Sequence, residues 1–153
     1  MDVTGPEIHA ARFDDLDVAT LHDLLALRSE VFIVEQQCTY LDIDGRDSEP
    51  ATVHMWIEAD GAIAATLRVL TEPDGAIRIG RVCTRPSARG RGYAAQLVRA
   101  AAADLDVDAV LAAQSHLRGW YEQFGFVVDG PEFDDVGITH VPMRRTGRRS
   151  RSE

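Results

Sequence analysis

Arginine and glycine gather in one short stretch, RVCTRPSARGRGYAA, which runs from Arg81 to Ala95 in a chain of formal net charge −9. Glycines let successive backbone N–H groups converge, and a helix beginning directly behind them adds its own unpaired N–H groups and positive dipole end. Hydrogen bonds to a charged acceptor contribute about 1.5–3 kcal/mol each, so several such amides hold a diphosphate without a metal. Arg85, Arg89 and Arg91 are expected to reach further phosphates. The stretch therefore predicts a pyrophosphate-binding turn.

Two other interpretations of this stretch start from the same residues. The run from Gly90 to Ala95 fits the G-x-G-x-x-A fingerprint of dinucleotide folds, which follows the first strand of a βαβ unit and requires an acidic residue at the end of the next strand. Here three predicted strands come first, and Asp106 and Asp108 precede the next strand, so this interpretation is disfavoured. An exposed turn whose arginines only add solubility remains an alternative.

Hydrophobic periodicity predicts the elements that position this turn. Asp60-Gly61 and Asp74-Gly75 are typical of hairpin turns and indicate three antiparallel strands in succession. A strand, a helix and a strand follow in the order of a right-handed parallel crossover, which makes the chain a mixed α/β (α+β) protein. The predicted strands cover residues 7–13, 53–59, 62–70, 76–84, 109–114, 126–129 and 138–143, and the predicted helices cover 18–32, 93–105 and 117–124.

Composition limits the class of protein. A length of 153 residues with 45% apolar residues suits one domain. No leader or membrane-spanning run is evident, and Cys38 and Cys83 are far apart, so we expect a soluble, cytoplasmic protein in a reducing compartment without a membrane partner. The absence of Lys excludes Schiff-base chemistry and a P-loop lysine. The acidic balance argues against nucleic-acid partners and favours cationic small molecules.

The segment from Asp42 to Asp47, DIDGRD, superficially resembles a calcium loop. The EF-hand pattern requires Gly at its sixth position and Glu at its twelfth, and the twelfth position counted from Asp42 is Val53. We therefore expect no metal. Asp42, Asp44 and Asp47 are interpreted either as a solvated turn or as a rim that attracts a cationic acceptor.

Three motifs together resemble a known family. Residues 89–94, RGRGYA, match the R/Q-x-x-G-x-G/A signature of the Gcn5-related N-acetyltransferases (GNAT) and stand between the predicted fourth strand and its helix. Residues 121–126, YEQFGF, resemble the family's Y-E-x-x-G-F, and the region from Arg28 to His54 is similar to the ElaA-like branch. The resemblance covers most of the chain.

The resemblance implies an acyl-CoA N-acyltransferase fold, with acetyl-CoA as co-substrate and no metal. Its mixed sheet has splayed central parallel strands, so that residues 77–84 and 110–114 leave a gap for pantetheine. It implies one GNAT domain over residues 1–145, followed by a basic, disordered tail over 146–153, in a monomer or homodimer. The cofactor-binding residues it implies are Val82, Cys83 and Thr84 for pantetheine, Arg89, Gly90, Arg91, Gly92, Tyr93 and Ala94 for the pyrophosphate, and Gln114, where many members carry Asn.

The implied reaction is direct attack of a primary amine on the thioester in a ternary complex, with a small molecule or a peptide as the acceptor. Deprotonating a lysine-like amine at pH 7 costs roughly 4–5 kcal/mol, so a general base is useful. Glu35 and His54 are the first candidates, ahead of His116 and His140, and partial burial is expected to raise the pKa of Glu35. By its place in the motif, Tyr121 is the proton donor to the leaving thiolate; otherwise it is a core aromatic.

Two other classes of function remain open. A non-catalytic acyl-CoA-binding module needs only the backbone of the turn and no catalytic residue. A nucleic-acid-binding protein would rest on the arginines of residues 144–151 alone. Release of thiol from acetyl-CoA in the presence of amines separates the enzyme from the binding module.

Overall fold

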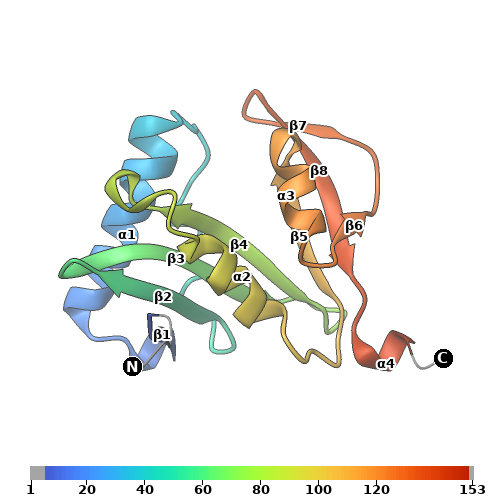
Figure 1. Cartoon of the computed structure of the whole chain (residues 1–153), viewed down its shortest axis with the longest axis horizontal. Helices are drawn as coiled ribbons and strands as arrows, with labels where there is room; N and C mark the ends of the chain where they lie inside the picture. Colours follow the sequence, from blue (N-terminus) through green and yellow to red (C-terminus); the bar gives the residue numbers. More distant parts are fainter. Residues whose placement is uncertain (1–5, 152–153) are drawn as a thin grey trace. The chain divides into compact units, whose positions relative to one another are not determined.

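The computed structural model describes residues 6–151, with the side chains of Ser150 and Arg151 left out. Its strands are β1 (Ile8–Arg12), β2 (Val53–Ala59), β3 (Ala62–Thr71), β4 (Ile77–Thr84), β5 (Ala109–Gln114), β6 (Val127–Val128), β7 (Phe133–Asp135) and β8 (Ile138–Arg145). Its helices are α1 (Val18–Arg28), the π-helical η2 (Ser29–Glu35), α2 (Tyr93–Ala102), α3 (Arg118–Glu122) and α4 (Arg148–Arg151). Short 3₁₀ turns are η1 (Phe13–Asp15), η3 (Pro86–Ala88) and η4 (Ser115–Leu117) (Figure 1).

The strands form one mixed sheet in the hydrogen-bonded order β1-β2-β3-β4-β5-β8-β6, with β7 paired to β8. The β4–β5 pair is parallel, with Ile77 opposite Ala109 and Arg78 opposite Val110. The β1–β2 pair and the pairs that β8 makes with β5, β6 and β7 are antiparallel. This confirms the predicted mixed α/β fold. The splay of the central strands beyond Arg78 remains a prediction.

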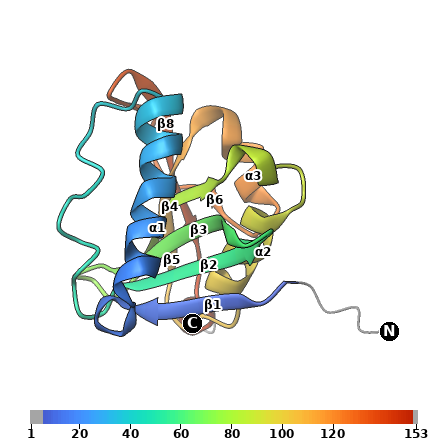
Figure 2. The same ribbon diagram turned by 90° about the vertical axis from the view of Figure 1, so that its left-hand side faces the viewer.

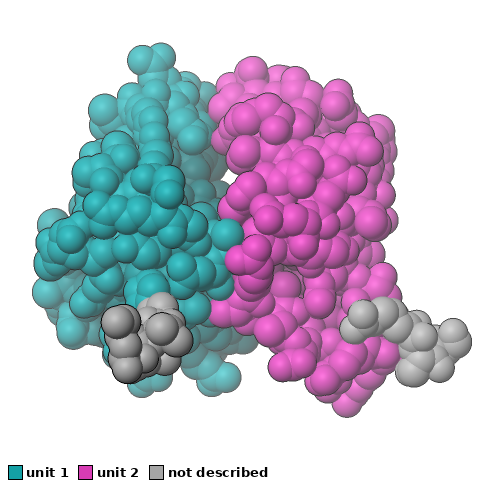
Figure 3. All heavy atoms as spheres, in the orientation of Figure 1, with its two compact units in different colours: residues 1–68, 81–97 teal, residues 69–80, 98–153 magenta. Residues whose placement is uncertain are grey.

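The chain divides into two compact units (Figure 3). Unit 1 comprises residues 1–68 and 81–97, and unit 2 comprises residues 69–80 and 98–153. The strands β3 and β4 and the helix α2 contribute residues to both units. The predicted assignment of residues 1–145 to one domain therefore remains a prediction.

Unit 1 has a helix on each face of its strands. Figures 1 and 2 show α1 on one face of β2 and β3, and the start of α2 lies on the other face. Asp17 caps α1, because its side chain accepts a hydrogen bond of 2.7 Å from the backbone N–H of Thr20. Asp60 and Gly61 both have positive φ, 56° and 77°, as a type I′ hairpin turn requires. The largest fully buried apolar side chains of unit 1 are Leu24, Ile57, Leu67 and Leu97.

Unit 2 is built around β5, which pairs with β8 along its whole length from Ala109 to Gln114. The predicted tail over 146–153 begins differently in the structure, because Gly147 donates a backbone hydrogen bond of 2.8 Å to Asp108 and residues 148–151 form α4. Residues 152–153 lie outside the described residues. Across residues 6–151, no helix is long and apolar enough to span a membrane.

Candidate functional site

The turn between β4 and α2 has the backbone of an anion cradle. Gly90 and Gly92 have φ values of 83° and 79°, in the left-handed region that favours glycine. A Cβ added at either position would meet no atom within 4 Å, so open space lies in front of both glycines. The helix α2 begins at Tyr93 directly after the turn, which leaves its first N–H groups without intrahelical partners. The residues present therefore fit an anionic ligand at the position predicted from the sequence.

Two arginines of the turn are exposed and paired with carboxylates of unit 1. Arg89 donates two parallel hydrogen bonds to Glu35, from Nη1 to Oε2 at 2.7 Å and from Nη2 to Oε1 at 2.5 Å. Arg91 donates from Nη1 to Asp60 Oδ2 at 2.9 Å. The side chains of Arg89 and Arg91 are 43% and 45% exposed, so both remain accessible to a ligand from solvent.

Arg85 differs from Arg89 and Arg91, because its guanidinium bonds backbone oxygens. It donates from Nη1 to the backbone oxygen of Ile63 at 3.1 Å and from Nη2 to that of Ala59 at 3.3 Å. Its Nε also donates to Ser87 at 2.9 Å. The guanidinium of Arg85 thus ties the turn to the β2–β3 hairpin, and the expectation that Arg85 reaches a phosphate remains a prediction.

Glu35 is the last residue of η2, and the wider turns of this π-helix place its carboxylate beside Arg89. The hydrogen bonds from Arg89 hold the pKa of Glu35 below its usual value, and the burial of this carboxylate is too slight to offset them. The expectation that burial raises this pKa is thus wrong. A carboxylate with a lowered pKa, held by a guanidinium fork, is a weak general base.

His54 lies in the interior of unit 1 and is only 2% exposed. Its Nε2 lies 3.1 Å from the backbone oxygen of Asp47, which can only accept, so Nε2 carries the proton. Burial lowers the pKa of His54 and outweighs the opposing effect of Asp47. The sequence ranked His54 as a base from its intrinsic pKa, but a neutral ring buried in this way does not reach solvent.

A buried ionic network surrounds His54. Arg28 contacts Asp42 through Nε at 3.1 Å and Asp47 through Nη1 at 2.7 Å. Arg68 contacts Asp44 through Nη2 at 2.7 Å and Asp47 through Nη1 at 3.0 Å. The side chains of the two arginines are 3% and 4% exposed. Both sequence-based interpretations of the aspartates are therefore wrong for Asp42 and Asp47, which are neither a solvated turn nor an exposed rim.

The arginines keep these carboxylates ionised. Hydrogen bonds from Arg68 are the main cause of the strongly lowered pKa of Asp44. Burial alone would raise the pKa of Asp47, but the hydrogen bonds and charges of Arg28 and Arg68 outweigh it, so that this pKa is also lowered. The network thus stabilises the folded chain only while its aspartates are deprotonated.

The predicted pantetheine strand, Val82 to Thr84, is the last part of β4 in unit 1. Burial raises the pKa of the Cys83 thiol to about 12, which makes this side chain an inert part of the core. Val82 and Thr84 are half-buried. Hydrogen bonds from this backbone to pantetheine remain a prediction.

In unit 2, Gln114 ends β5 opposite His140 of β8. The ring of His140 stacks on Phe133 with centroids 5.7 Å apart, and its Nδ1 donates to the backbone oxygen of Ile138 at 2.9 Å. The Ser115 hydroxyl, next along the chain from Gln114, is buried and has no hydrogen-bond partner among the described residues. Polar groups therefore gather where β5 ends, and His116 follows there with an exposed side chain.

Tyr121 lies in an aromatic cluster of unit 2 and is 7% exposed. Its ring packs edge-to-face with those of Trp120 and Phe126, with ring centroids 4.8 Å and 6.3 Å apart. Burial raises the pKa of Tyr121 to about 12, so the phenol stays protonated and is available as a hydrogen-bond donor. Both the motif-based role and the core role predicted for this residue are compatible with the position.

Sequence reasoning missed the residues that surround the buried aspartates. The only signal was Arg28, which falls at helical spacing on the apolar face of α1. A charged residue on such a face indicates a buried ion pair, although it does not identify the partner. Among residues 6–151, no group of three or more His, Cys, Asp or Glu side chains is arranged to hold a metal.

Several known proteins are similar to this chain in fold and in sequence. A crystal structure of an acyl-CoA N-acyltransferase from Pseudomonas aeruginosa is 38% identical with a TM-score of 0.86, covering 93% of this chain and 100% of that one. Escherichia coli ElaA is 32% identical in its crystal structure with a TM-score of 0.84, covering 92% and 99%. The protein Rv2851c of Mycobacterium tuberculosis is 49% identical over 138 residues, 87% of this chain and 88% of the relative. The fold is thus that of the acyl-CoA N-acyltransferases.

The family follows from these similarities and from one further match. The sequence profile of the acetyltransferase (GNAT) domain matches residues 20–146. This chain therefore belongs to the GNAT acetyltransferase family, and within it to the ElaA-like branch.

Proposed function

We propose that this protein is an N-acetyltransferase that moves acetyl from acetyl-CoA to a primary amine by direct attack in a ternary complex. The observation that carries the proposal is the left-handed turn at Gly90 and Gly92, which opens onto free space and leads directly into α2. Such a turn binds the pyrophosphate of CoA through backbone N–H groups and the positive end of the helix dipole. Family membership supports an acyl-CoA substrate for this turn.

Unit 1 supplies most of the groups proposed to hold the co-substrate. The N–H groups of residues 90–94 bind the pyrophosphate, and Arg89 and Arg91 offer guanidinium groups to its oxygens. The backbone of residues 82–84 pairs with the pantetheine amides. The family resemblance also gives the side-chain amide of Gln114 a part in cofactor binding. These bonds are made by backbone groups and arginines, so binding requires no metal.

The reaction needs a proton to leave the amine and negative charge to be stabilised on sulfur. The amine nitrogen attacks the thioester carbon, the C–S bond breaks, and the thiolate leaves. Complete proton transfer from Tyr121, with a pKa of about 12, to a thiolate of ordinary pKa near 8.5 is uphill by about 5 kcal/mol. Tyr121 therefore acts by donating a hydrogen bond that strengthens as charge develops on sulfur.

In this proposal neither Glu35 nor His54 removes the amine proton. Glu35 is held by Arg89, and His54 is buried with Nε2 bonded to the backbone of Asp47. The amine reacts from its neutral form and passes its proton to water. Because the chain has a formal net charge of −9, its field attracts cationic amines, so a small polyamine or a basic peptide is the expected kind of acceptor.

A panel of amines and peptides tests the function. Each acceptor is incubated with acetyl-CoA, and both released thiol and the mass of the acceptor are measured. We expect thiol and acetylated acceptor in equal amounts, and turnover lowered about 10²–10³-fold in Tyr121→Phe with acetyl-CoA affinity unchanged. Binding of acetyl-CoA without thiol release by any acceptor would favour the non-catalytic binding module instead.

A further inference from the structure

Arg81 has a backbone conformation that its residue type disfavours. Its φ is 52°, in the left-handed region, although it lies inside β4. This region is disfavoured about 5- to 30-fold for an L-residue with a Cβ and is normally occupied by glycine. A left-handed residue within a strand interrupts the pleat and changes the direction of the N–H and C=O groups that follow it, as in a G1-type bulge. The groups that follow Arg81 are those of Val82 to Thr84.

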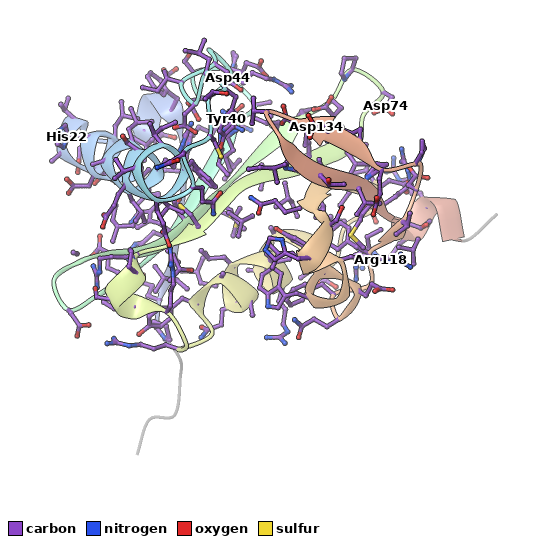
Figure 4. The ribbon with its side chains drawn as sticks, turned by 90° about the horizontal axis from the view of Figure 1, so that it is seen from above. His22, Tyr40, Asp44, Asp74, Arg118 and Asp134 are labelled. Atoms are coloured by element: carbon purple, nitrogen blue, oxygen red, sulfur yellow. The ribbon has the colours of Figure 1, made fainter. Side chains whose placement is uncertain are left out.

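A neighbouring segment, residues 40–44, surrounds the Arg81 side chain. Arg81 Nε lies 2.8 Å from Asp42 Oδ1, and Nη2 donates to the backbone oxygen of Asp42 at 3.2 Å. The same Nη2 lies 3.5 Å from the backbone oxygen of Leu41 and 3.4 Å from Asp44 Oδ2. The guanidinium also lies over the ring of Tyr40, 4.7 Å from its centroid. The guanidinium is thus held on several sides by one segment, whose Tyr40 and Asp44 lie close together in Figure 4.

This segment is itself anchored to the core of unit 1. Asp42 is fixed by Arg28, which bonds both its carboxylate and, from Nη2 at 2.9 Å, its backbone oxygen. Asp44 is fixed by Arg68 through two hydrogen bonds. The segment therefore offers Arg81 a binding site whose groups are already in place, since Arg28 and Arg68 are buried.

We propose that residues 40–44 form a clamp that keeps Arg81 left-handed and thereby sets the course of β4 through Val82 to Thr84. Arg81 is then a positioning residue for acyl-CoA binding, and this role rests on the proposed function. The clamp supplies the side-chain contacts that make an arginine tolerable where glycine is normally required. Without them, the backbone of Arg81 relaxes toward the extended conformation, and the groups that meet pantetheine turn away.

Two substitutions at one position separate the backbone role from the loss of charge. Arg81→Ala and Arg81→Gly remove the same guanidinium, but only glycine adopts the left-handed conformation freely. We expect the dissociation constant of acetyl-CoA to rise about tenfold in Arg81→Ala and less than threefold in Arg81→Gly, in line with the conformational preference. Arg78→Ala, which removes an arginine from the same strand, serves as a control with unchanged affinity.

Hydrogen exchange of the amides of residues 82–84 tests for the clamp in the absence of acetyl-CoA. We expect these amides to exchange faster than in the wild type in Arg81→Ala and at the wild-type rate in Arg81→Gly. If the wild type fails to bind acetyl-CoA, the proposed function is wrong, while the exchange rates still decide whether the clamp exists. Equal exchange and equal affinity in the alanine and glycine variants would overturn the clamp.

Discussion

Two sets of arginines in unit 1 differ in their exposure to solvent and in the number of carboxylates that each arginine binds. Arg28 and Arg68 are 3% and 4% exposed, and each bonds two different aspartates of the segment between η2 and β2. Arg89 and Arg91 are more than 40% exposed, and each bonds one carboxylate at the surface. The buried set is shielded from water and salt, whereas the pairs of the exposed set are screened and can exchange one anionic partner for another.

Because of this difference in burial, the two sets of arginines have different roles. A buried guanidinium with several fixed partners cannot leave them without exposing charge to a low dielectric, so Arg28 and Arg68 maintain structure. An exposed guanidinium loses little when a phosphate replaces its carboxylate, which suits Arg89 and Arg91 to ligand binding. Arg81 joins the two sets, because it pairs with the buried Asp42 and the half-buried Asp44 and lies in the strand that leads to the turn.

The largest expected effect is on stability at Arg28. Arg28→Ala leaves Asp42 and Asp47 buried without this partner, and we expect the free energy of unfolding to fall by about 3–5 kcal/mol. Arg91→Ala, measured in the same urea titration, should leave the unfolding midpoint unchanged. Equal stability losses in the two variants would remove the distinction between the buried and exposed sets.

The second effect concerns binding at Gly92. Gly92→Val places a branched side chain in the open space of the turn at a φ of 79°, and we expect the dissociation constant of acetyl-CoA to rise at least about 100-fold through the loss of two or more charged hydrogen bonds. Gly75→Val is a matched control, because Gly75 has a φ of 91° and equally open surroundings in another turn. Both variants should lose similar stability, but only Gly92→Val should lose affinity. Unchanged affinity in Gly92→Val would place the pyrophosphate elsewhere.

The sequence was sufficient to predict most of the fold. The predicted strands over residues 53–59 and 109–114 match β2 and β5 residue for residue, because alternation and hairpin turns are local signals. The helix predicted over 18–32 instead ends at Arg28 and continues as the π-helical η2, since apolar periodicity does not distinguish the two. The three-residue strand β7 was not predicted, because all its side chains are exposed and it shows no alternation.

The candidate site was only partly predictable. The glycine turn carries a local motif, and the structure has the predicted helix directly after it, with both glycines left-handed. The arginine partners of Asp42 and Asp44 could not be identified from the sequence, because Arg28 and Arg68 are separated from them by 14 and 24 positions along the chain. The pairing of Glu35 with Arg89 spans 54 residues and depends on tertiary structure in the same way.

Acid should destabilise the protein in two stages. The pKa of His54 is lowered from 6.5, so the unfolded chain takes up this proton first and stability falls as the pH drops below about 6.5. The pKa values of Asp44 and Asp47 are lowered from 3.8, so their contribution is lost below about pH 4. Urea midpoints measured from about pH 7.5 down to about pH 2.5, a range that extends beyond the ordinary pKa values of both His and Asp, should show both declines. The first decline should be absent from His54→Gln, and its persistence there would assign it to another group.

The smallest expected effect concerns Glu35. Glu35→Ala frees Arg89 from its carboxylate, and we expect acetyl-CoA to bind roughly two- to fivefold more tightly, as for an exposed ion pair. Glu30→Ala removes a nearby exposed charge from the same helix and serves as the control. Turnover should stay within a few-fold of the wild type. A loss of turnover beyond about 100-fold, with binding intact, would restore Glu35 as the general base.

Calorimetric titration with acetyl-CoA and with S-acetylpantetheine, which lacks the pyrophosphate and the nucleotide, measures whether the turn at Gly90 and Gly92 holds the pyrophosphate of acetyl-CoA. We expect the wild type to bind acetyl-CoA at least about 100-fold more tightly than S-acetylpantetheine. We expect Gly92→Val to bind the two compounds with nearly equal, weak affinity. Similar affinities of the wild type for both compounds, or an undiminished preference for acetyl-CoA in Gly92→Val, would place the pyrophosphate outside this turn.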